Sequence, residues 1–148
     1  MPRRSRAREV VLQVLYADDA NPDRSLTDSD QFLQGRLKNA VELVEFARSL
    51  LAGVRRNRGE LDEMLNHCAD NWSLSRMAVT DRNVLRLGGY EIVFTETPNA
   101  VVINEAVDLA KRFGAKHSGK FVNGILDKLA QSQRAANGDS TSDPAPNA

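Results

Sequence analysis

Helical periodicity is the sequence feature that most constrains the fold of this chain. From Val10 to Leu129, apolar residues recur at intervals of three, four or seven, which is the spacing that places side chains on one face of an α-helix. No segment has the character of a buried parallel strand. The 148 residues suffice for one domain with a real core. The pattern therefore predicts an all-α fold without a sheet.

The first half of the chain shows three periodic segments. A polar stretch from Asp18 to Asp30 is expected to end the first, and Asn57 and Gly59 are expected to separate the second from the third. In the first segment Arg8, Glu9 and Gln13 should face away from the apolar stripe. The three predicted stripes are Val10, Val11, Val14 and Leu15; then Leu37, Val41, Val44, Leu51 and Val54; then Leu61, Leu65 and Cys68.

The second half carries clearer boundary signals. Thr80-Asp81 and Thr97-Pro98 resemble helix starts, Gly114 resembles a helix end, and Ser118 can cap the last helix. The expected stripes are Val84, Leu85, Gly88 and Ile92; then Val102, Ala106, Leu109 and Phe113; then Phe121, Val122, Ile125, Leu126 and Leu129. We expect one domain over residues 1–136, with halves at 3–70 and 74–136. The small polar residues at 137–148 predict a disordered tail.

The segment Gly114–Phe121, GAKHSGKF, resembles a phosphate-binding P-loop at every position except the last. A P-loop needs a Ser or Thr after its lysine to hold magnesium, and it connects a buried strand to a helix. Phe121 has no metal-binding group, and an amphipathic helical pattern precedes Gly114. The sequence thus predicts a helix–helix connection and no nucleotide binding.

Other chemistry is also poorly supported by the sequence. A single cysteine, Cys68, allows no internal disulfide, and no apolar run approaches the ~18 residues of a membrane span, so we expect a cytoplasmic protein. His67 and Cys68 are adjacent and would point about 100° apart on a helix, which favours a half-buried thiol and a solvated imidazole over a catalytic pair. We expect no catalytic residues, no metal site and no cofactor.

Charge is balanced overall but segregated along the chain. Twenty Lys and Arg offset twenty Asp and Glu, yet the first residues carry four arginines before any acid, and residues 109–126 carry four cations with no acid. Segregated basic segments can bind nucleic acid locally. A bare arginine run is more often a solvated end, but this one leads directly into a helix in which Arg8, Leu12 and Tyr16 share one row. For Phe121 alone, core packing is the better interpretation.

Three motifs resemble the bacterial antitermination factor NusB family. They are RRSRAREVVLQVLYADD at 3–19, LLAGV at 50–54, and VVINEAVDLAKRFGAKHSGKFVNGILDKLA at 101–130. The resemblance covers the chain from about Arg3 to Ala130. It implies about seven helices in two small packed bundles and no enzyme activity.

The resemblance also implies partners. It suggests binding to the boxA element of nascent ribosomal RNA together with NusE, a small-subunit ribosomal protein, as part of an RNA polymerase complex that reads through terminators. The implied partner-binding residues lie in the segment 81–91, where Asp81, Arg82 and Glu91 are expected to point outward. The candidate RNA-binding residues are Arg3, Arg4, Arg6, Arg8, Tyr16, Lys116, Lys120 and Phe121.

Two departures from the family pattern concern the RNA surface. Ser5 interrupts the arginine run, and Ala115-Lys116-His117 stands where an acid is expected, which would make this surface more basic. Two alternative functions stay open. One is an RNA-guiding module of a ribosomal RNA methyltransferase system, although the chain has no glycine-rich methyl-donor segment. The other is a self-associating structural homodimer.

Overall fold

The computed structural model describes residues 3–23, 26–70 and 72–137, with only the backbone of 26 and 27. These residues form seven α-helices and one short 3-10 helix, and no strand occurs among them. The all-α prediction is confirmed. The elements are α1 (Arg3–Ala20), α2 (Leu26–Arg36), α3 (Val41–Arg56), α4 (Arg58–Cys68), η1 (Leu74–Arg76), α5 (Val79–Phe94), α6 (Asn99–Phe113) and α7 (Ser118–Ala136).

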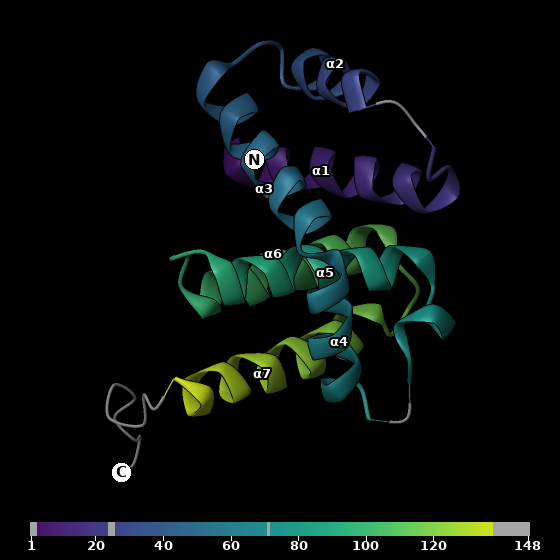
Figure 1. The fold of residues 1–148 in the computed structure, drawn as a ribbon, viewed down its shortest axis with the longest axis vertical. Helices are drawn as coiled ribbons and strands as arrows, with labels where there is room; N and C mark the ends of the chain where they lie inside the picture. The colour runs from purple at the N-terminus through teal and green to yellow at the C-terminus, as the bar shows by residue number, and fades with distance from the viewer. Residues whose placement is uncertain (1–2, 24–25, 71, 138–148) are drawn as a thin grey trace.

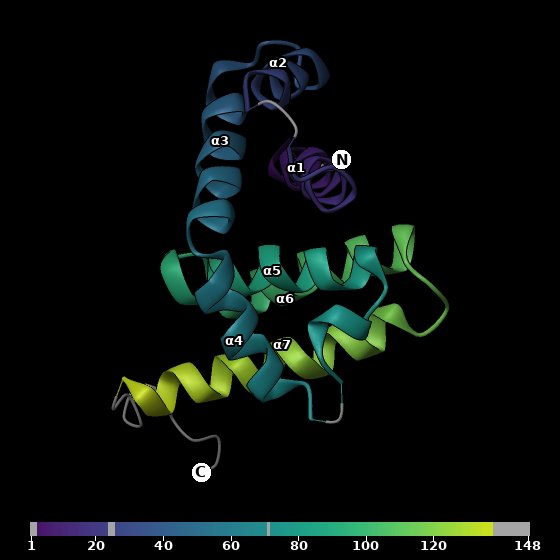
Figure 2. The same ribbon diagram turned by 45° about the vertical axis from the view of Figure 1, so that its right-hand side comes forward.

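Helices α1, α2 and α3 pack together at one end of the molecule, and α4 to α7 pack at the other (Figure 1). Helix α3 runs from α2 toward α4, and α5 contacts both α1 and α3 (Figure 2). Helix α5 is therefore the central element, and residues 83–89 along it are all buried. How the chain divides into independent folding units stays a prediction.

Helix α1 is buried on more of its surface than its apolar stripe predicts. The four stripe residues are buried as expected, but Arg8 and Glu9, which were predicted to face away, are buried too. The reason is that α1 contacts α2, α3 and α5, so that little of its middle faces water. The helix also begins at Arg3, well before the first apolar residue of the stripe.

The connection after α1 differs from the prediction. The polar stretch expected to run to Asp30 contains most of the first two turns of α2. Leu37 lies beyond the end of α2 and does not begin α3. Between the two helices Lys38 and Asn39 adopt left-handed φ angles of 55° and 57°, which reverse the chain. The predicted second helix therefore begins later, at Val41, and α2 is a separate helix that the sequence did not predict.

The predicted helix ends fit better than the predicted starts. Asn57 follows α3 and Gly114 follows α6, as expected. Ala78 precedes α5 and Pro98 precedes α6, each without a side-chain cap, so both starts are displaced from the predicted capping residues. Helix α6 directly precedes the loop at Gly114, in the place where a P-loop would have a buried strand.

Of the predicted disordered tail, residues 138–148 lie outside the described residues. None of the helices in the described ranges combines the length and the apolarity of a membrane span.

Candidate nucleic-acid interface

The first turn of α1 presents two arginines to solvent. Arg3 and Arg4 are exposed, and the Arg4 guanidinium lies over the Phe46 ring, 4.2 Å from its centroid. Such cation–π contact orients a guanidinium without removing its hydrogen-bond donors. Arg6 is half-buried and forms an ion pair with Glu9, at 3.1 Å. Arg3 and Arg4 are thus the arginines best placed to meet a phosphate.

Arg8 is not available to a phosphate. The residue is 3 % exposed, and its side chain donates two hydrogen bonds of 2.8 Å to the carboxylate of Glu91, from Nε and from a terminal nitrogen. Burial alone would lower the pKa of Arg8, but the hydrogen bond and charge of Glu91 and the charge of Glu105 outweigh it and raise that pKa. Arg8, Leu12 and Tyr16, which share one row of helix α1, consequently do not form one exposed binding surface.

Glu91, predicted to point outward toward a partner protein, is 2 % exposed. That prediction is wrong, because α1 lies against this part of α5 and Arg8 neutralises the carboxylate there. Ser5, which interrupts the arginine run, donates a hydrogen bond of 2.7 Å to Glu105. It thereby ties the start of α1 to α6.

Tyr16 remains a candidate for stacking on a base, since it is 50 % exposed. It lines a cavity of about 430 Å³ together with Gln13, Thr80 and Phe113. Phe113 was predicted to lie in the core but is 41 % exposed, at the end of α6. Its exposure could not be predicted, because helical spacing alone does not show whether the last residue of an apolar stripe is covered by other helices.

The connection between α6 and α7 forms a second group. Lys116 and Lys120 are exposed, and Phe121 is half-buried. The Phe121 ring meets the Trp72 ring edge to face, with centroids 6.4 Å apart. Trp72 is 55 % exposed. It is a second residue that the sequence reasoning missed, although it is the only tryptophan in the chain and lies in a polar connection.

The start of α5 lies between these two groups. Thr80 lines the cavity that contains Tyr16, and Asp81 lines a cavity of about 370 Å³ that contains Lys116, Phe121 and Trp72. Tyr16 and Lys116, far apart in sequence, thus belong to neighbouring cavities on either side of one helix start. The arginines of the first turn of α1 lie about three turns of helix away from Tyr16.

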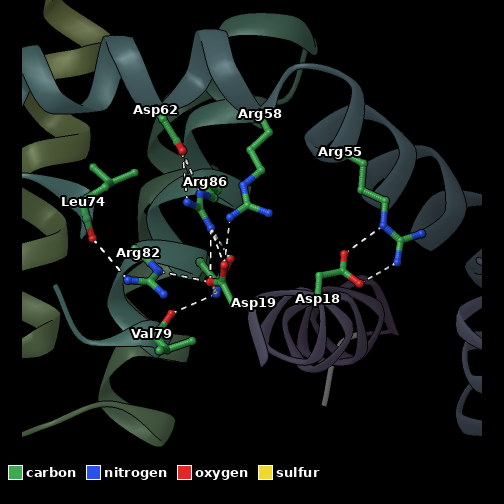
Figure 3. Close-up of polar contacts among 10 residues, drawn as sticks. Asp18, Asp19, Arg55, Arg58, Asp62, Leu74, Val79, Arg82 and Arg86 are labelled. Atoms are coloured by element: carbon green, nitrogen blue, oxygen red, sulfur yellow. Dashed lines mark hydrogen bonds and ion pairs between the residues drawn. The ribbon is translucent and has the colours of Figure 1, made fainter. Parts of the chain in front are cut away.

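Arg82 is held within a cluster of charges around Asp19 (Figure 3). The Asp19 carboxylate accepts hydrogen bonds from Arg58, Arg82, Arg86 and Asn83, at 2.7 to 3.4 Å. This cluster connects the end of α1 to α4 and α5. Arg82 is nevertheless partly exposed, with 19 % of its side chain accessible to solvent.

Catalytic or metal chemistry has little support among the described residues. No group of three or more His, Cys, Asp or Glu is arranged to hold a metal ion in the described part of the chain. His67 is exposed, as the sequence predicts, whereas Cys68, which was predicted to be half-buried, is buried. Burial raises the pKa of the Cys68 thiol, which disfavours the reactive thiolate.

Similarity to known proteins decides the family. The sequence profile of the NusB family matches residues 5–131. The chain belongs to the NusB family. It is 43 % identical over 128 residues to the transcription antitermination protein NusB of Anaeromyxobacter dehalogenans strain 2CP-1, covering 86 % of this chain and 90 % of that protein. Identity to NusB of Desulfitobacterium hafniense strain DCB-2 is 42 % over 134 residues, or 85 % and 86 % of the two chains.

Solved structures of the NusB family share the fold. Thermotoga maritima NusB superposes with a TM-score of 0.78 at 39 % identity, covering 88 % of this chain and 92 % of that one. A crystal structure of the antitermination factors NusB and NusE in complex with double-stranded RNA gives a TM-score of 0.76 at 26 % identity, covering 89 % and 98 %. This agreement confirms the NusB-like fold that the sequence motifs imply.

Proposed function

We propose that this NusB family member is an RNA-binding transcription antitermination factor that acts with a NusE protein. The observation that carries the proposal is the match to a NusB in a complex with NusE and double-stranded RNA, over most of both chains. The first turn of α1 supplies exposed cations, of which Arg4 lies over the Phe46 ring, and the α6–α7 connection supplies Lys116 beside Phe121 and Trp72. This combination suits single-stranded RNA, which offers phosphates and unstacked bases together.

The proposed RNA-binding set is smaller than the sequence suggests. Arg3, Arg4, Lys116 and Lys120 would contact phosphates, with Arg6 as a weaker contributor because Glu9 already pairs with it. Tyr16 and Phe121 would contact bases. Arg8 is left out, since releasing it would strand the buried carboxylate of Glu91.

We infer further that the RNA is the boxA element of nascent ribosomal RNA and that the complex with NusE acts on RNA polymerase in the cytoplasm, without catalysis by this chain. Electrophoretic mobility shifts of a short boxA-like RNA against a scrambled RNA, with and without NusE, test this directly. We expect tighter binding to the boxA-like RNA, and tighter still with NusE. Equal affinity for the two RNAs in both conditions would contradict the boxA assignment.

The contact with NusE is proposed at the start of α5, where Asp81 and Arg82 are partly exposed. Arg82→Ala should lower the affinity for NusE measured without RNA. A thermal melt must accompany it, because Arg82 also bonds to Asp19. Arg56→Ala is the matched control, since Arg56 is exposed at the end of α3 and lines none of the cavities described above. Unchanged NusE affinity in a folded Arg82→Ala variant would exclude this residue.

A further inference from the structure

A polar cavity of about 450 Å³ lies among α4, η1 and α5, beside the cluster of charges around Asp19. Its volume is within the range of sites that enclose small molecules. None of the described residues that line it is aromatic. It therefore differs from the cavities that contain Tyr16 and Lys116, each of which has aromatic rings in its wall. The charged and amide side chains that line it are Asp19, Arg58, Asp62, Asn66, Arg82 and Arg86.

Positive charge exceeds negative charge in the wall of this cavity. Three arginines meet two aspartates there, and the side chains of Arg58, Arg82 and Arg86 converge on Asp19 (Figure 3). Both oxygens of each carboxylate already accept hydrogen bonds, Asp19 from all three arginines and Asp62 from Arg86. The side chains of Arg86 and Asp19 are 6 % and 7 % exposed, so salt and water screen these charges less than at an open surface. One arginine therefore has no counterion of its own among the residues that line the cavity.

Hydrogen-bond donors are in excess as well. Arg58, whose side chain is 44 % exposed, bonds through one terminal nitrogen to Asp19. Arg82 bonds through Nε to Asp19 and through one terminal nitrogen, at 3.5 Å, to the carbonyl of Leu74, and its other terminal nitrogen has no partner in the described part of the chain. Asn66 is exposed and accepts the backbone N–H of Leu74 through Oδ1, which leaves its amide nitrogen as a donor. A ligand rich in acceptor oxygens complements such a wall.

We propose that this cavity binds a phosphate group, as inorganic phosphate or as the phosphate of a small monoester. A phosphate group carries negative charge on strong acceptor oxygens, and guanidinium groups bind it through paired N–H donors. Arg58 and Arg82 contact its oxygens, and Asn66 supplies a neutral donor from α4. Arg86, whose three nitrogens already form hydrogen bonds, contributes charge alone.

The wall of the cavity disfavours other ligands. A nucleobase finds no ring on which to stack, and the arginines repel a metal cation. An acidic side chain of a protein brings a planar carboxylate, whereas the available donors come from two helices, α4 and α5, and suit a tetrahedral anion better. The phosphodiester of RNA shares the chemistry of a free phosphate, so the experiment must separate these two sources. The inference requires neither RNA nor NusE, although Arg82 is common to this cavity and to the proposed contact with NusE.

Calorimetric titration of the full chain, without RNA or NusE, tests the site. The probes are inorganic phosphate, ribose 5-phosphate and an all-uridine oligomer, at constant ionic strength in a buffer free of phosphate and sulfate. We expect saturable binding of inorganic phosphate and of ribose 5-phosphate. Inorganic phosphate should also raise the melting temperature, because a ligand that binds only the folded state stabilises it, and potassium chloride of equal ionic strength should not reproduce that rise.

Two variants assign the binding to this cavity. Arg58→Gln should weaken the binding of inorganic phosphate about tenfold, the loss of a charge-assisted hydrogen bond. It should fold, because Asp19 keeps its other donors. Asn66→Asp keeps the acceptor for the η1 backbone but adds a negative charge, and it should abolish binding. Arg56→Gln is the matched control, since Arg56 is exposed at the end of α3 and does not line the cavity.

The outcomes also identify the source of the phosphate. Weaker phosphate binding in Arg58→Gln and Asn66→Asp, with an unchanged affinity for the all-uridine oligomer, would support a free phosphate compound as the ligand. Weaker binding of both probes, with competition between them, would support the site and assign it to the RNA backbone. Absence of saturable phosphate binding, equal binding in all the variants, or stabilisation that potassium chloride reproduces would overturn the site. None of these three results would affect the proposed binding of RNA and NusE, which is measured separately.

Discussion

The guanidinium of Arg8 and the carboxylate of Glu91 form a two-bond ion pair between α1 and α5, with both bonds at 2.8 Å. The two side chains are 4 % and 2 % exposed. A second carboxylate, Glu105 of α6, lies 3.8 Å from Arg8. This pair joins the end of the molecule that contains α1 to α5 and α6, and it turns two predicted binding residues into structural ones.

Removing one partner of this pair should be severe. Arg8→Ala leaves Glu91 buried without its cation and should lower the free energy of unfolding by about 3–5 kcal/mol, as measured by urea denaturation. The double variant Arg8→Met, Glu91→Leu removes both charges and should recover much of that loss. A loss well below ~1 kcal/mol in the single variant would show that the pair is open to water in solution.

Asp19 should contribute to acid sensitivity. Burial alone would raise its pKa, but hydrogen bonds from Asn83 and Arg82 and the charges of Arg86 and Arg82 lower that pKa below the ordinary 3.8. Its contribution to stability is therefore present above pH 3.8 and is lost as the pH falls through that value toward the lower folded pKa. Asp19→Asn should reduce stability at pH 7 and flatten the fall in acid. An equally steep loss of stability in acid in the variant would show that groups other than Asp19 cause the acid sensitivity.

Two glycine substitutions should act in opposite directions. A Cβ on Gly53 of α3 would collide with the ring of Tyr90 on α5. Gly53→Ala should therefore destabilise the protein by about 1–3 kcal/mol, despite the higher helix propensity of alanine. Gly124, in α7, has open space around its Cβ position, and Gly124→Ala should stabilise by up to ~1 kcal/mol. In thermal melts, the melting temperature should fall below that of the wild type for Gly53→Ala and rise above it for Gly124→Ala.

Tyr16 and Phe113, the exposed aromatic residues of the cavity beside α1, should contribute to RNA binding without contributing charge. Tyr16→Ala should weaken RNA binding by about 1–3 kcal/mol, the loss of one stacked base, with the salt dependence nearly unchanged. Phe113→Ala tests whether the neighbouring ring shares this role. Both side chains are about half exposed, so the melting temperature should change little. Unchanged affinity in both variants would show that no base stacks there.

Much of the fold could be predicted from the sequence, because helical periodicity reports which residues face a core. The stripes of α4, α5 and most of α7 lie where they were expected. The burial of Arg8 and Glu91 could not be predicted, since it depends on α1 and α5 being neighbours in space. The division between α2 and α3 was also missed, because the left-handed turn at Lys38 and Asn39 lies within an unbroken apolar pattern.

The candidate site was predicted only in part. Exposed cations in polar segments, such as Arg4 and Lys120, could be found from charge segregation alone. Trp72 and Asp81 could be recognised as site residues only from the fold, in which η1, α5 and the α6–α7 connection enclose one cavity. That enclosure is a tertiary property and leaves no local signal in the sequence.

The salt dependence of RNA affinity shows whether the exposed cations of α1 and α7 contact RNA phosphates. It should be measured by anisotropy with a short single-stranded boxA-like RNA, for wild type and for Arg3→Ala, Arg4→Ala, Lys120→Ala combined. Deleting residues 2–8 would be less clean, because Ala7 and Arg8 are buried. Each lost phosphate contact should flatten the logarithmic slope by about 0.7, or about two units in total. Arg56→Ala should leave the slope unchanged. A triple variant with the wild-type slope would show that these cations are solvated and that RNA binds elsewhere, if at all.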